Sequence, residues 1–115
     1  MANKEDNVYL IHILKCIKRI EEYTRLKSED DFKEAFMMQD AVIRQIEIIG
    51  EAANKLSKIF PRSNSQINWS EIVGMRHKLI HDYFDVDPTV VWMKVQQDIP
   101  PLKNEILKIL RTYKS

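Results

Sequence analysis

The hydrophobic positions along the chain recur at intervals of three and four residues, which is the period of an amphipathic α-helix. The first such pattern predicts a helix from about Glu5 to Leu26. Its expected buried stripe, which Val8 and Ile11 widen, consists of Leu10, Ile13, Leu14, Ile17, Ile20 and Tyr23.

A second helical region is predicted from Ser28 to about Ile59. Ser28 suits the N-cap, and the acids that follow it suit the first turn, where the helix dipole favours negative charge. The pattern is imperfect near Phe36, where a break is expected. The apolar positions of this region are Phe32, Phe36, Ile43, Ile46, Ile49, Ala53, Leu56 and Phe60.

The remaining chain divides at a loop and at two proline sites. The segment from Pro61 to Asn68 predicts the loop, and a helix over 69–83 follows it, capped by Asn68 or Ser70. Asp87 and Pro88 fit the N-cap and first position of a last helix, which the pair at 100–101 must kink or interrupt. No alternation typical of a strand occurs. The sequence predicts an all-α bundle of four to five helices.

Composition narrows the class of protein. The length of 115 residues fits a single domain over 1–115, and no stretch approaches the ~20 apolar residues of a membrane span. The start lacks the apolar segment of a signal peptide, and the single Cys16 fits a reducing compartment. We expect a soluble, cytoplasmic protein. The net charge of +1, from 18 basic and 17 acidic residues, does not indicate a nucleic-acid binder by itself.

The helix over 69–83 carries an arginine within its apolar stripe. Arg76 falls in the middle of the face formed by Trp69, Ile72, Val73, Leu79, Ile80 and Tyr83. A guanidinium stays charged, so in such a place it needs a carboxylate, a carbonyl or a phosphate as acceptor. His81 follows about 140° around the helix, at the border of the stripe and within reach of the arginine. One helix therefore combines a cation, an imidazole that titrates near neutral pH and a phenol.

These residues resemble a known signature. The run Arg76-His77-Lys78-Leu79-Ile80-His81-Asp82-Tyr83 fits the Arg-x4-His-x-Tyr motif of the HEPN ribonuclease domains. It is most similar to the HepT toxins, which are encoded beside a minimal nucleotidyltransferase antitoxin, MntA. The flanking segments over 41–53 and 91–100 resemble the same toxins. The family often has asparagine where this chain has His77, so the role of that position stays open.

The resemblance implies an HEPN-type bundle that acts as the ribonuclease toxin of a toxin–antitoxin pair. It implies Arg76 and His81 as catalytic residues. It also implies that Tyr83 receives AMP from an MntA-like nucleotidyltransferase, which would place bulk and negative charge where the RNA phosphate binds. Lys78 and His77 are candidates for contacting RNA.

The chemistry of the pair agrees with metal-independent RNA cleavage. A base must deprotonate the attacking 2′-hydroxyl, an acid must protonate the leaving oxygen, and a cation must stabilise the phosphorane. Histidine suits the first two roles and arginine the third. One Arg76–His81 pair lacks an acid or a base, so we expect a homodimer with a composite cleft. The stripe over 69–83 is also too apolar to face water, which favours a dimer as well.

Three other interpretations remain open. Arg76 could pair with a buried carboxylate such as Glu51, with His81 at the surface. The chain could instead be an inert helical module that binds a nucleotide or docks a nucleotidyltransferase, so that the pair holds a phosphate without cleaving it. His77 and His81 have a spacing that could ligate zinc, but no third ligand is convincing, and we expect no metal or cofactor.

Overall fold

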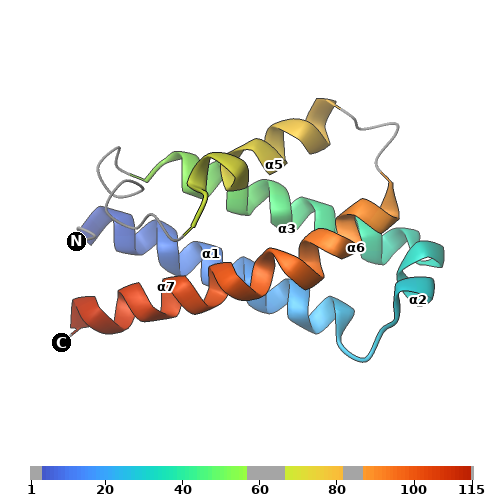
Figure 1. Ribbon diagram of the computed structural model, residues 1–115, viewed down its shortest axis with the longest axis horizontal. Coiled ribbons are helices and arrows are strands. Elements are labelled where there is room, and N and C mark those ends of the chain that lie inside the picture. The colour runs from blue at the N-terminus through green and yellow to red at the C-terminus, as the bar shows by residue number, and fades with distance from the viewer. Residues whose placement is uncertain (1–3, 57–66, 82–86, 115) are drawn as a thin grey trace.

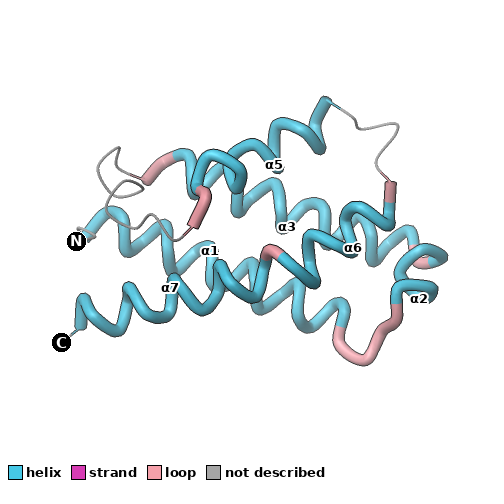
Figure 2. Tube along the Cα trace, in the orientation of Figure 1, coloured by secondary structure: helices cyan, strands magenta, loops and turns pink. Residues whose placement is uncertain are grey.

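The computed structural model describes residues 4–56, 67–81 and 87–114, which form an elongated helical bundle (Figure 1). Its principal extents are 43 × 29 × 20 Å. Within these ranges Figure 2 shows helices joined by short turns and no strand, which confirms the predicted all-α class. The helices are α1 (Lys4–Thr24), α2 (Glu29–Glu34), α3 (Phe36–Asn54), α5 (Trp69–His81), α6 (Pro88–Gln97) and α7 (Ile99–Lys114).

The core lies where α1 packs between α3 and α7. Most positions of the two predicted stripes are buried, and Tyr23 and Ile43 are half-buried. The helix α5 covers the side of α3 away from α7 (Figure 1). Lys103 of α7 also pairs with Glu21 of α1 at 2.9 Å, which ties these two helices together at the surface. The core side chains with no exposed surface are Leu10, Ile13, Ile17, Ile20, Phe32, Val42, Ile49, Leu102 and Ile106.

The expectation that Val8 and Ile11 widen the stripe of α1 is wrong. Their side chains are 55% and 43% exposed. At about 100° per residue, both positions lie more than 100° from the centre of the buried stripe. The buried face of α1 is widened instead by Asn7 and Cys16.

The second helical region breaks near Phe36, as the pattern predicts. Ala35 has φ −104° and ψ 84°, which is outside the helical region and separates α2 from α3. The Gln39 side chain donates hydrogen bonds from Nε2 to the carbonyls of Phe32, at 2.8 Å, and Lys33, at 3.1 Å, which satisfies the end of α2. Phe36 itself was expected in the core and is 74% exposed, because the break points the start of α3 outward.

The start of α2 and the end of α1 have specific local causes. The Ser28 side chain accepts from the backbone N–H of Asp31, while the Asp31 carboxylate accepts from the N–H of Ser28. This reciprocal capping box confirms Ser28 as the N-cap. The first helix ends at Thr24, two residues before the predicted end, and Leu26 then adopts a positive φ of 59°. That left-handed conformation terminates the helix.

The prolines define the last two helices as predicted. The Asp87 side chain caps α6 by accepting from the N–H of Thr89, and Pro88 occupies the first helical position. A turn at Asp98 then separates α6 from α7, so that the prolines at 100–101 fall in the first turn of α7, where their missing N–H groups cost nothing. The predicted helix end at Ile59 and most of the loop that begins at Pro61 lie outside the described residues.

None of the described helices has the length and hydropathy needed to cross a membrane.

Candidate active site

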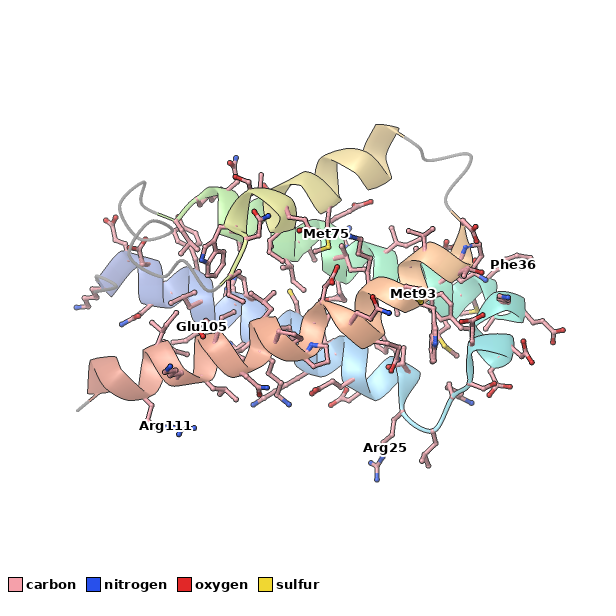
Figure 3. All side chains as sticks on the ribbon, viewed as in Figure 1. Arg25, Phe36, Met75, Met93, Glu105 and Arg111 are labelled. Carbon is pink, nitrogen blue, oxygen red and sulfur yellow. The ribbon has the colours of Figure 1, made fainter. Side chains whose placement is uncertain are left out.

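The helix α5 is fixed against α3 by the first half of its apolar stripe. Trp69, Ile72 and Met75 are 4–6% exposed, and Figure 3 shows Met75 between α5 and the helices beneath it. Asn68 is the residue that caps the helix, because its side chain accepts from the N–H of Glu71 at 3.2 Å. Of the predicted stripe, Trp69 and Ile72 are buried on the side of α5 that packs against α3, and Val73 is half-buried. Met75, which the sequence pattern did not include in the stripe, is buried beside them.

The backbone of α5 continues to His81, so its period places the candidate catalytic positions. Position 76 lies one turn after Ile72 and two turns after Trp69, on the face that packs against α3. This agrees with the prediction that Arg76 belongs to the stripe. The side chains from Arg76 to His81, including the candidate RNA contacts His77 and Lys78, are outside the described part of the structure.

Position 81 lies on the opposite side of α5. It follows Gly74 by seven residues and therefore falls within about 20° of it around the helix. Gly74 is exposed, and a Cβ built on it meets no atom within 4 Å. The sequence pattern placed His81 at the border of the stripe, whereas α5 places the position on its outward face. Positions 76 and 81 are about 7.5 Å apart along the axis. Tyr83 comes two residues after the end of α5, outside the described residues.

A second copy of the chain is not needed to cover the described half of the stripe. Trp69, Ile72 and Met75 are already covered by α3 within one chain. The apolarity of this half therefore gives no reason for a dimer, contrary to the expectation from the sequence.

The alternative in which Arg76 pairs with a buried Glu51 does not fit the structure. Glu51 is exposed on α3, and its position lies on the far side of that helix from the buried residues Val42, Ile46 and Ile49. Near the start of α5, the carboxylate of Glu71 forms an ion pair with Lys94 of α6. The Glu71 Oε1 and Lys94 Nζ atoms are 3.5 Å apart. That pair is partly exposed and so contributes little to stability.

The structure adds a buried polar residue that the sequence pattern did not single out. Gln45 of α3 is 5% exposed, and its Oε1 has no hydrogen-bond partner among the residues that the structure describes. Figure 1 shows α5 running antiparallel along α3. Gln45 lies about 14 Å before the end of α3, and position 76 lies about 11 Å after the start of α5, so both fall near the middle of the helix pair. In the sequence, the one sign that Gln45 is buried is that it falls on the same helical face as the apolar residues of α3. This sign is weak, because glutamine is common on exposed helix faces.

We expect Gln45→Met to leave the free energy of unfolding unchanged or to raise it by up to about 2 kcal/mol. Methionine has a similar shape and removes an acceptor that is desolvated without compensation. As a matched control in the same helix, Ile49→Ala should lower the free energy of unfolding by about 2–4 kcal/mol, because it leaves a cavity. Urea unfolding measures both. A loss above about 1 kcal/mol for Gln45→Met would mean that its amide has a partner in solution.

On α1, Cys16 is buried and His12, four residues before it, is exposed. Cys16 is 4% exposed, and burial raises the pKa of its thiol. A thiol that stays protonated is a poor nucleophile and a poor metal ligand. Among residues 4–56, 67–81 and 87–114 no group of three potential metal ligands comes together.

Comparison with known proteins decides the family. The model of the family described as "Ribonuclease HepT-like" matches residues 13–109, a range that contains the whole motif on α5 and beyond it. The chain belongs to the HepT-like ribonuclease family. The sequence-based assignment to HepT-type HEPN ribonucleases, and with it the enzyme class of ribonuclease, is confirmed.

The relatives of this HepT-like chain carry similar names. A probable ribonuclease HepT of Thermococcus cleftensis is 46% identical over 101 residues, which cover 88% of this chain and 92% of that protein. An RNase candidate of Caldanaerobacter subterraneus is 38% identical over 111 residues, or 96% of this chain and 99% of that protein.

A third relative is longer. A protein of Methanocaldococcus jannaschii, named as a gamma-glutamylcyclotransferase and RNase candidate, is 51% identical over 107 residues, which cover 93% of this chain. The chain spans about half of that relative, since the match covers 48% of it. No solved structure matches the chain significantly.

Proposed function

We propose that this chain is the toxin of a toxin–antitoxin pair and that it cuts RNA internally without a metal ion. The observation that carries the proposal is the family match over residues 13–109, which includes the complete Arg-x4-His-x-Tyr spacing. The placement of positions 76 and 81 on one ordered helix, α5, supports it further.

In this proposal Arg76 and His81 carry the chemistry. An imidazole takes the proton from a 2′-hydroxyl, whose oxygen forms a bond to the adjacent phosphorus. The bond from phosphorus to the 5′-oxygen breaks, and an imidazolium donates a proton to that oxygen. The guanidinium of Arg76 binds the non-bridging oxygens as charge accumulates on them. The products are a 2′,3′-cyclic phosphate and a 5′-hydroxyl.

The proposed cleft combines the α5 helices of two copies. One imidazole cannot be base and acid in the same step, whereas two copies about a two-fold axis supply both. Position 81 on the outward face of α5, in line with exposed Gly74, agrees with such an arrangement. Lys78 and His77 are proposed to contact the RNA backbone next to the cleft.

The proposed regulation acts through Tyr83. A cognate MntA-like nucleotidyltransferase transfers AMP to its hydroxyl, and the new phosphate competes with RNA for Arg76. In the sequence Tyr83 directly precedes a segment without helical periodicity, Phe84 to Asp87, and a phenol in such a place is easier to reach than one in the middle of a helix. The test is growth of cells that express the chain alone and together with the product of its neighbouring gene. We expect growth arrest that the neighbour relieves; unimpaired growth of cells that contain the folded chain alone would contradict the proposal.

The dimer has its own measurement. We expect light scattering at micromolar concentration to give about twice the mass of the 13.7 kDa chain, and RNA cleavage per chain to fall on dilution as the dimer dissociates. A monomer that is stable and fully active at the same concentration would remove the composite cleft from the proposal.

A further inference from the structure

The short helix α2 and the start of α3 form an ordered corner at one end of the bundle (Figure 1). Phe32 anchors it, since this side chain has no exposed surface and its ring centroid lies 5.4 Å from that of Trp92 in α6. The capping box at Ser28 and the Gln39 amide satisfy the backbone at the two ends of α2. The segment from Ser28 to Asp40, here named the α2–α3 corner, is thus held in place on both sides.

The corner presents large apolar side chains to solvent. Phe36 is 74% exposed and Met37 is 87% exposed. Val90 and Met93, each 43% exposed, lie on the outward face of α6, and Figure 3 shows Met93 and Phe36 at the same end of the bundle. Aromatic residues and methionine are the types enriched at protein interfaces, and adjacent exposed ones on an ordered surface indicate a binding site.

The corner is also acidic. Between Ser28 and Asp40 the chain has five carboxylates and one lysine, a net charge of −4, although the whole chain carries +1. Lys33 pairs with Glu29 at 3.1 Å, and the exposed carboxylates around that pair are Asp30, Asp31, Glu34 and Asp40. Hydrogen bonds from Ser28 lower the pKa of Asp31, so this carboxylate stays ionised at neutral pH.

The charge selects among possible occupants. RNA is excluded because its phosphates would face carboxylates. A second copy packed about a two-fold axis is disfavoured because it would bring the same acidic surface against itself. A protein with apolar pockets surrounded by lysine and arginine satisfies both the exposed side chains and the charge.

We propose that the α2–α3 corner docks a partner protein that receives Phe36 and Met37 in an apolar centre with a basic rim. This inference rests on the proposed function, in which the partner is the nucleotidyltransferase encoded beside the chain. Because α3 and α5 are antiparallel, the start of α3 and the end of α5 lie at the same end of the bundle (Figure 1). A partner held at the corner is therefore at the end of the bundle where α5 ends at His81.

The test uses the full chain and the purified nucleotidyltransferase from the neighbouring gene. The double variant Phe36→Ser/Met37→Ser should weaken their binding, measured by calorimetry, by about 100-fold, because it removes both anchors. Asp30→Lys/Glu34→Lys should weaken binding mainly at low salt. The control is Val8→Ser/Ile11→Ser, which changes two exposed apolar residues of α1 and should bind as the wild type does.

Three further readouts decide between the occupants. RNA cleavage and the mass of the chain alone should be unchanged in Phe36→Ser/Met37→Ser, and circular dichroism should show the same helix content. The proposal is overturned if this variant binds with wild-type affinity or if the control loses as much affinity. It is also overturned if the oligomeric state of the variant changes or if the wild-type chain does not bind the partner. Docking that depends on the corner while the wild type cuts no RNA would instead contradict the proposed function and leave the docking site standing.

Discussion

Arg76→Ala and His81→Ala should each lower the rate of RNA cleavage by about 10²–10⁴-fold. This is the range for removing a general acid–base group or a preorganised group that stabilises transition-state charge. His81→Ala should leave stability almost unchanged, because position 81 lies on the outward face of α5 in line with exposed Gly74. Single-turnover cleavage of a labelled RNA measures the rates, and thermal unfolding verifies the fold.

Lys55→Ala serves as the control for this pair. Lys55 is an exposed basic residue that follows α3, and its loss should change cleavage by less than about twofold. Full activity in both purified variants, Arg76→Ala and His81→Ala, would remove these residues from the active site. A similar loss in Lys55→Ala would mean that the assay responds to charge in general.

Tyr83→Phe should abolish transfer of AMP by the cognate nucleotidyltransferase and leave the toxin active in its presence. The reason is that phenylalanine keeps the ring and removes the hydroxyl that accepts the AMP. Cleavage by the variant alone should stay within about threefold of the wild type, since the proposed mechanism assigns no proton transfer to this hydroxyl. Mass spectrometry of the co-expressed pair measures the modification.

Tyr9→Phe is the matched control, because Tyr9 is another tyrosine of the chain, on α1. It should be modified and neutralised like the wild type. AMP found on Tyr9, Tyr23 or Tyr113 in place of Tyr83 would contradict the proposed regulation. Neutralisation of Tyr83→Phe by binding alone would do so too.

The sequence predicts this fold well because the helices bury continuous stripes. In α1 the residues from Leu10 to Ile20 at intervals of three and four are all buried, and capping residues such as Ser28 and Asp87 fix where later helices begin. The pattern fails at Phe36, because apolar character alone does not tell a core position from an exposed one beside a break. The helix period on its own could not show which neighbour covers the stripe of α5, and that neighbour is α3.

The candidate site was predictable for a different reason. The spacing from Arg76 to Tyr83 is local, so the chain shows it directly, and the helix α5 then places positions 76 and 81 on its two sides. The buried Oε1 of Gln45 was not predictable, since it depends on contacts between helices that are distant in sequence. The exposed side of α3 on which Glu51 lies, by contrast, follows from the helix period alone, because its position is opposite Ile46 and Ile49.

The most direct test of the proposed chemistry is an analysis of the ends of the RNA that the purified chain produces in the presence of EDTA. We expect cleavage to persist and to leave 2′,3′-cyclic phosphate and 5′-hydroxyl ends, and a 2′-deoxy substitution at the cut site should stop it, because the attacking group is the 2′-hydroxyl. Products that carry 5′-phosphate and 3′-hydroxyl ends, or cleavage that requires an added metal ion, would contradict a metal-independent Arg76–His81 active site.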